Sequence, residues 1–139
     1  MAYVVAVTAV RNWINSLDTL VGAGRPLALG AFRQHPRSPG HGAYALLSRI
    51  GRATGDLVAE DTIDSPRISA SIFAGTDEAA EIAAVAYANA VDALRGTPAA
   101  MGDTRCLVAD DLAGPLLVDN HDSDREQYHY VVDASFFLL

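Results

Sequence analysis

The sequence predicts a single α+β domain, in which a mostly antiparallel or mixed β-sheet is flanked by two main α-helices. Apolar residues occupy every second position in 66–74 and in 130–138, which is the period of a β-strand. They recur at steps of three and four in 3–21 and 80–94, which is the period of a helix. A length of 139 residues fits one hydrophobic core. We therefore expect one domain, 1–139, with the element order αβββαββ.

Composition and charge narrow the function classes. The net charge is −7, and all ten basic residues are arginines scattered along the chain, whereas tight nucleic-acid binding needs clustered cations. Half of the residues are apolar, which argues against disorder. Cys106 is the single cysteine, so no internal disulfide is expected and a reducing compartment is the simpler expectation. We expect no leader peptide and no membrane span, since no segment approaches the ~20 apolar residues that a bilayer requires.

The first helix is predicted over 3–16. Its apolar stripe consists of Tyr3, Val7, Val10, Ile14, Leu17 and Val21. Trp13 lies beside this stripe and is expected in the core. The glycines and the proline of "VGAGRP", 21–26, end the element, and a short strand is expected over 27–33.

Two loops and a strand follow. "QHPRSPGHG", 34–42, is dense in proline and glycine and predicts a loop. "AYALLSRI", 43–50, has the length and content of a strand. The polar segment 51–66 predicts a long exposed connection, and connections of this length are often functional. Both loops are therefore candidate contact elements.

The second half has the clearest signals. "PRISASIFAG" predicts a strand, after which Thr76 is placed to cap a helix whose first turn carries Asp77 and Glu78. The helix over 77–95 ends at Gly96 and Pro98. Two further strands are expected, one near 104–110 and the terminal one.

The terminal strand has an unusual pattern. The face that carries Tyr130, Val132 and Phe136 is uniformly apolar, whereas the other face mixes apolar residues with Asp133. We expect such a strand in the middle of a sheet, or with a partner on its second side. Because an unpaired carboxylate would be costly inside it, either the face of Asp133 is wet or an arginine such as Arg67 meets it.

The motifs of nucleotide and calcium sites are incomplete in this sequence. GxGxxG fails because Leu27 stands where the third glycine belongs, and the acidic turn "DNHDSD", 119–124, lacks the glycine of a calcium loop. His35 and His41 share a loop, where solvated side chains are a simpler interpretation than a metal site. We expect no cofactor. Cys106 is expected to be buried as a small hydrophobe. The neighbours Asp110 and Asp111 should point to opposite faces of a strand, which excludes a catalytic carboxylate pair.

Residues 65–139 resemble the tail terminator, or tail completion, proteins of long-tailed bacteriophages. The shared pattern begins with a strand that opens on Pro66 and Arg67, followed by the helix start "TDEAA" at 76–80. A Gly-Pro turn at 114–115 and a closing Tyr-x-Val-Asp-Ala strand at 130–134 complete it. The first half of the chain carries no comparable signature.

The resemblance implies a virion structural protein and not an enzyme. It implies a homo-oligomeric ring, expected to be a hexamer, that caps the head-proximal end of the tail tube and stops tube polymerisation. The implied partners are the tail tube protein and the head-tail stopper or other neck proteins. Genomic DNA would pass through the ring without specific binding, which suits an acidic chain. Assembly would occur in the bacterial cytoplasm and the mature location would be the neck of the virion.

We expect the subunit and tube contacts on the polar face of two strands and in the two loops. The candidate residues are Arg67, Ser69, Ser71, Phe73, Val131, Asp133, Phe137, Arg52, Asp56 and His41. One alternative is another neck component, such as the head-tail stopper or head completion protein. A second is a small α+β ligand-binding protein or enzyme that uses the loop of His35 and His41.

Overall fold

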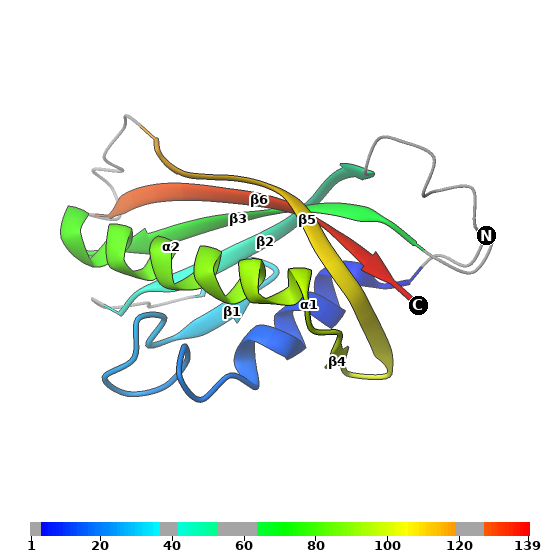
Figure 1. Ribbon diagram of the computed structural model, residues 1–139. Helices are drawn as coiled ribbons and strands as arrows, with labels where there is room; N and C mark the ends of the chain where they lie inside the picture. The colour runs from blue at the N-terminus through cyan, green and yellow to red at the C-terminus, as the bar shows by residue number, and fades with distance from the viewer. Residues whose placement is uncertain (1–3, 37–41, 53–63, 119–126) are drawn as a thin grey trace.

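The computed structural model describes residues 4–36, 42–52, 64–118 and 127–139, which form one six-stranded sheet with two helices (Figure 1). The strand order is β1-β2-β3-β6-β5-β4. The helices are α1 (Ala6–Asn15) and α2 (Asp77–Asp92), and a 3-10 turn, η2 (Ala93–Arg95), follows α2. The strands are β1 (Gly30–Phe32), β2 (Tyr44–Arg52), β3 (Pro66–Ala74), β4 (Ala99–Met101), β5 (Thr104–Leu117) and β6 (Tyr128–Leu138). The predicted α+β class is confirmed.

The sheet is mixed. β1 runs parallel to β2, and every other neighbouring pair is antiparallel. β6 lies in the interior, between β3 and β5. Backbone hydrogen bonds continue to the last residue, because the N–H of Leu139 donates to the Arg105 carbonyl at 2.9 Å and its carbonyl accepts from the Arg105 N–H at 3.2 Å. The expectation that the terminal strand sits in the middle of a sheet is confirmed.

Two differences from the predicted order concern the region after α2. β4 was not predicted, so the observed order is αβββαβββ. β5 extends to Leu117 and is longer than the predicted 104–110, because bulges between Asp110 and Leu116 let the strand bend and stay paired with β6. The predicted Gly-Pro turn therefore lies inside β5, where Gly114 has a φ of 98°. A turn dipeptide inside a bulged strand has the same local sequence as a turn between strands.

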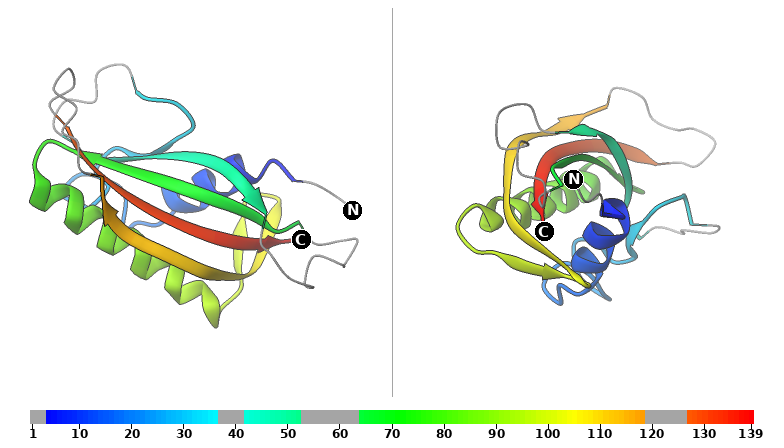
Figure 2. Two further views of the ribbon diagram at one scale, coloured as in Figure 1. Left: turned by 90° about the horizontal axis from the view of Figure 1, so that it is seen from above. Right: turned by 90° about the vertical axis from the view of Figure 1, so that its right-hand side faces the viewer.

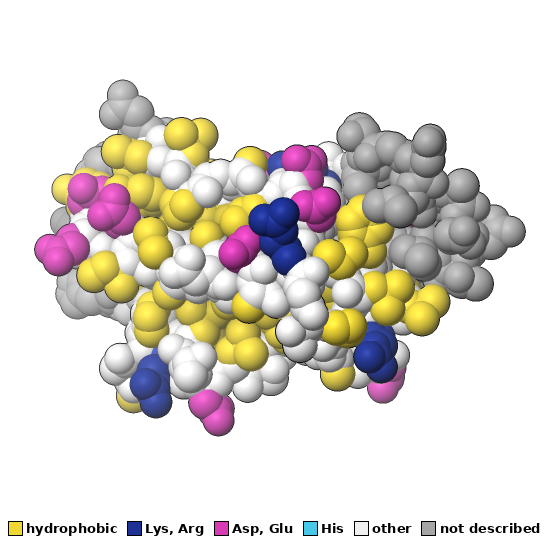
Figure 3. Space-filling model, viewed as in Figure 1, with side chains coloured by type: hydrophobic (Ala, Val, Ile, Leu, Met, Phe, Trp, Pro, Cys, Tyr) yellow, Lys and Arg dark blue, Asp and Glu magenta, His cyan; other side chains and the backbone are white. Residues whose placement is uncertain are grey.

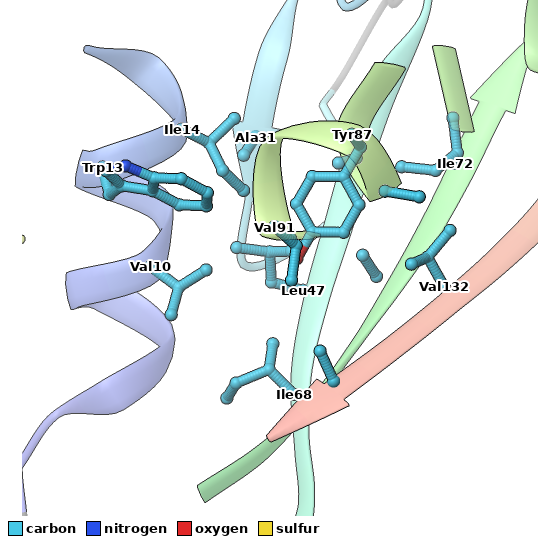
Figure 4. Packing of buried hydrophobic residues seen from close by; sticks show 14 of the residues in the cluster. Val10, Trp13, Ile14, Ala31, Leu47, Ile68, Ile72, Tyr87, Val91 and Val132 are labelled. Atoms are coloured by element: carbon cyan, nitrogen blue, oxygen red, sulfur yellow. The ribbon is translucent and has the colours of Figure 1, made fainter. Parts of the chain in front are cut away.

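Both helices pack on one face of the sheet and enclose the core (Figure 4). α1 begins at Ala6, later than the predicted Tyr3, and buries Val10, Ile14 and Trp13. The Trp13 ring meets Phe136 of β6 edge to face, with 6.4 Å between ring centroids. The expected core position of Trp13 is confirmed.

α2 confirms its predicted start. The Thr76 hydroxyl accepts a hydrogen bond from the Ala79 N–H at 3.1 Å. The buried face of the helix is mainly alanine, which lets the helix axis lie close to the sheet, and Tyr87 is the one large side chain that it inserts there. The Tyr130 hydroxyl donates to Asp77 at 3.1 Å and so ties β6 to the first turn of α2.

A buried ion pair closes one end of the sheet. Asp64, fully buried, accepts from Arg49 of β2 at 2.9 Å and 3.2 Å and from the backbone N–H of Val4 at 3.1 Å. Asp64 also forms a two-bond bridge to Leu138 of β6. The prediction of an exposed connection over 51–66 is therefore wrong at both of its ends, since Gly51 and Arg52 belong to β2 while Asp64 and the residue after it are buried. Residues 53–63 lie outside the described part of the chain.

The edge strand β1 is held by a side chain. Asn15, the last residue of α1, accepts from the N–H of Ala31 at 2.8 Å and donates to its carbonyl at 3.2 Å. The amide thereby replaces a neighbouring strand at this point of the edge. β1 is also shorter than the predicted strand over 27–33. No helix in the described ranges is long and apolar enough to cross a membrane.

A candidate assembly surface on the second face of the sheet

The second face of the sheet, opposite the helices, carries the predicted contact residues. The left view of Figure 2 looks onto the strands from above, with α1 behind them and α2 along the side of β5. Cross-strand register arranges its side chains in rows. From one end of the sheet the rows are Arg67–Ser135–Asp110, Ser48–Ser69–Asp133–Ala113, Leu46–Ser71–Val131–Leu116 and Tyr44–Phe73–His129. The structure therefore brings the candidates on β3 and β6 together on one surface, hereafter the second face.

Hydrogen bonds of Arg67 connect three strands at the charged end of the second face. Arg67 donates to the carbonyl of Asp111 at 3.0 Å, to its carboxylate at 3.3 Å and to the Ser135 hydroxyl at 3.2 Å. Arg67 therefore bridges β3, β6 and β5. The suggested pairing of Arg67 with Asp133 is not what the structure has, because Asp133 lies one row further along, opposite Ser69.

The middle of the second face combines small polar side chains with apolar ones. Ser69 and Ser71 are half-buried, and their small side chains leave the carboxylate of Asp133 between two strands without a bulky neighbour in its row. One oxygen of that carboxylate, Oδ1, is buried and has no hydrogen-bond partner among the described residues. Such an atom costs free energy unless a donor reaches it.

The other end of the second face is an aromatic cluster. Phe73 stacks on His129, with 4.4 Å between ring centroids and 16° between the planes, and on Tyr44 at 5.3 Å. His35 packs against Phe73 at 5.1 Å, and its Nδ1 lies 2.9 Å from the Tyr44 hydroxyl. That hydroxyl donates to the buried Gln127 at 3.2 Å. The expectation of a solvated His35 is wrong, since aromatic residues of two strands surround it.

Two candidates on this face are buried and so offer little contact area. Phe73 and Phe137 are each 7% exposed. The alternating pattern marked their face correctly, but aromatic residues from the segment before β2 and from β6 itself cover Phe73. Residues 32–44 contain several aromatic residues and histidines, which could have indicated that this segment covers Phe73. Hydrophobic periodicity does not take such composition into account.

The remaining candidates are placed only in part. Arg52 ends β2 opposite Pro66, whereas Gly51 is the β2 residue that lies opposite Arg67. His41 and Asp56 lie outside the described residues.

Comparisons with protein-family models, curated proteins and solved structures gave no match.

Three further kinds of reactive group are relevant: potential metal ligands, the cysteine and the neighbouring aspartates. Within 4–36, 42–52, 64–118 and 127–139, no three histidine, cysteine or acidic side chains are placed to hold a metal ion. Cys106 is fully buried, and burial raises the pKa of its thiol to about 11. Asp111 has a φ of 55° at a bulge, so the expected alternation fails there and Asp110 and Asp111 line the same hollow beside the end of α2.

Proposed function

We propose that this chain is a tail terminator of a long-tailed bacteriophage: a structural protein that forms a ring on the head-proximal end of the tail tube and stops its growth. It acts by shape and contact and not by chemistry. The ring would also present a surface to the head-tail stopper.

The observation that carries the proposal is the second face. It is the broad surface of the sheet that no described helix covers, and its centre combines the small side chains of Ser69 and Ser71 with apolar residues and the partly exposed Asp133, one oxygen of which has no donor among the described residues. Because Asp133 as a residue is partly exposed, a polar group from another protein molecule can contact its side chain. A surface built of a rigid sheet with small side chains suits contact with another ordered protein surface.

The resemblance supplies the kind of assembly. Its residues fall on structural landmarks: Pro66 and Arg67 open β3, Thr76 caps α2, and Tyr130 to Ala134 lie in the central strand. Asp133, the acidic residue of the closing motif, is the same residue whose oxygen lacks a partner.

Tube capping tests the proposal directly. Tail tube protein from the same genome would be polymerised with and without this chain, and tube lengths measured by negative-stain electron microscopy. We expect shorter tubes that carry a ring at one end, and we expect Asp133→Ala to weaken capping while Thr97→Ala, at an exposed and uncharged residue on the helix side of the sheet, leaves it unchanged. Tubes of unchanged length without rings would contradict the proposal.

The alternative within the same class is a head-tail stopper. Cryo-electron microscopy of virions would then place the ring against the capsid connector and not against the tube.

A further inference from the structure

The described charges are segregated across the sheet. Among the described side chains, the side formed by α1, β1, β2 and their connections, hereafter the basic flank, contains four arginines, of which Arg49 is paired with the buried Asp64, and one exposed acidic residue, Asp18. These arginines are Arg11, Arg25, Arg33 and Arg49. The side formed by α2, β4 and β5, hereafter the acidic flank, contains seven acidic residues and two arginines. Its acidic residues are Asp77, Glu78, Glu81, Asp92, Asp103, Asp110 and Asp111.

Each flank also exposes large apolar side chains. Eight such residues are exposed in the described ranges, and seven of them belong to the flanks. The basic flank has Val5, Leu29 and Ile50, and the acidic flank has Ile82, Val85, Leu116 and Leu117. Figure 3 shows apolar side chains over α2 and the adjacent end of β5, with acidic side chains beside them. Apolar residues gathered beside complementary charge are typical of protein interfaces.

The hollows of the two flanks differ in the same way. On the basic flank, a hollow of about 490 Å³ is lined by Arg11, Phe32, Arg33 and Gln34. On the acidic flank, a hollow of about 340 Å³ lies between the end of α2 and the bulge of β5, and its lining includes Asp92, Asp110 and Asp111. The charged lining of each hollow therefore mostly matches the charge of its flank, although Arg95 also lines the acidic one.

Each flank further contains a strand segment without an outer neighbour. β1 pairs only with residues 44–46 of β2, and β4 pairs only with residues 104–106 of β5. Within the described residues, the rest of each strand has no strand on that side. Bulges and Pro115 make the β5 edge irregular, so a continuous backbone ladder is disfavoured and side chains must supply the specificity.

We propose that copies of this chain associate head to tail, with the basic flank of one copy against the acidic flank of the next. This inference rests on the proposed ring and names its subunit interface, which leaves the part of the second face on β3 and β6 free for the tube or another partner. Self-pairing of one flank would oppose like charges, whereas flank-to-flank contact opposes unlike charges and repeats in one direction. A contact between two different surfaces of the same chain closes a ring when its rotation allows.

Two variants, each damaging one flank, test the interface. One is Arg25→Glu with Ile50→Glu on the basic flank, and the other is Glu78→Arg with Ile82→Arg on the acidic flank; all four residues are exposed. Arg25→Lys with Ile50→Leu and Glu78→Asp with Ile82→Leu are matched controls that retain charge and apolar character. Thermal unfolding establishes that each variant folds.

Mass photometry of purified chain gives the readout. We expect wild type and controls to form one closed oligomer at low salt that dissociates in about 0.5 M NaCl, where exposed charges are screened. Each damaged variant alone should be monomeric. Mixed in equal amounts, the two should form a heterodimer and nothing larger, because only one intact basic flank and one intact acidic flank remain.

Several results would contradict the proposed interface. A damaged, folded variant that still assembles alone, or a mixture that stays monomeric, overturns the inference. Wild type that stays monomeric also overturns it, and tube capping then decides the proposed function separately. If wild type caps tubes while both damaged variants still form rings, the function stands and this interface is wrong.

Discussion

Arg49 and Asp64 form an ion pair in which one nitrogen of the guanidinium contacts both carboxylate oxygens, at 2.9 Å and 3.2 Å. The Asp64 side chain is completely buried and the Arg49 side chain is 31% exposed. Through Asp64 the pair joins β2 to the backbone of Val4 and to the end of β6.

Asp64→Ala should lower the free energy of unfolding by about 3 kcal/mol, because it leaves a partly buried guanidinium and a backbone N–H without their acceptor. Urea unfolding followed by Trp13 fluorescence measures the loss. Asp18→Ala is the control, since Asp18 is exposed, and it should change stability by less than about 0.5 kcal/mol. Equal stability of the two variants would show that the ion pair contributes nothing net.

Asn15→Ala should destabilise the chain by about 1 to 2 kcal/mol, because both backbone groups of Ala31 lose their partner. Hydrogen exchange should show faster exchange of the Ala31 amide than of amides in β3. Asn12→Ala is the comparison, since the Asn12 amide accepts only from the neighbouring Arg11 in the same helix. If Asn15→Ala leaves the Ala31 amide protected, water replaces the side chain without cost.

Gly114→Ala should destabilise by at least about 2 kcal/mol. The φ of 98° disfavours a side chain, and a Cβ would meet the Val131 carbonyl oxygen of the central strand. Two glycine substitutions separate these causes by thermal unfolding. Gly24→Ala has a positive φ but open space, and Gly96→Ala has neither obstacle. The expected order of loss is Gly114, then Gly24, then Gly96.

Stability should fall on the acid side because of His129. Burial, and then the charge of His35, lower the pKa of His129 below its ordinary value. The unfolded chain therefore takes up a proton on His129 near pH 6.5, whereas the folded chain takes it up only at a lower pH. The contribution of neutral His129 to the free energy of unfolding is complete above pH 6.5 and is lost as the pH falls toward the folded pKa. Because one proton is involved, the free energy of unfolding should change by at most ~1.4 kcal/mol per pH unit.

His129→Phe tests this origin, because phenylalanine can stack on Phe73 and takes up no proton. Urea unfolding at pH 7 and pH 5 should show a smaller acid loss in the variant than in wild type. The same loss in both proteins would assign the acid sensitivity to other groups.

Cys106 should react slowly with a thiol reagent in the folded protein. Its pKa of about 11 leaves roughly one thiol in a thousand ionised at pH 8, and its side chain is buried. We expect modification at least about 100-fold slower in buffer than in urea. The folded thiol pKa lies above that of the unfolded chain, so stability is full below about pH 9 and declines as the pH rises toward 11.

Much of the fold could be predicted because its signals are local. Alternation located β3 and β6, the cap at Thr76 located α2, and the two-faced pattern of β6 indicated an interior strand. β4 has three residues, too few for a period to show, and the extension of β5 past Asp110 depends on bulges that pairing with β6 stabilises. Such features arise from tertiary pairing and leave no local pattern.

The candidate surface was predicted less completely. Alternation assigned Ser69, Ser71 and Asp133 to the correct face, since side-chain direction follows from strand period alone. It did not predict that Arg67 reaches Asp111, because that contact needs the positive φ of Asp111 and the neighbouring bulge. The burial of Phe73 depends on His35, which arrives from a segment with no regular pattern.

The interior position of β6 has a consequence for how the chain is made. β3 and β5 are both synthesised before the strand that lies between them, so the growing polypeptide holds two separate hydrophobic edges that have no shared neighbour. Nascent chains that stop before Tyr128 should therefore be good substrates for chaperones, and joining the two halves is the step at which folding and aggregation compete.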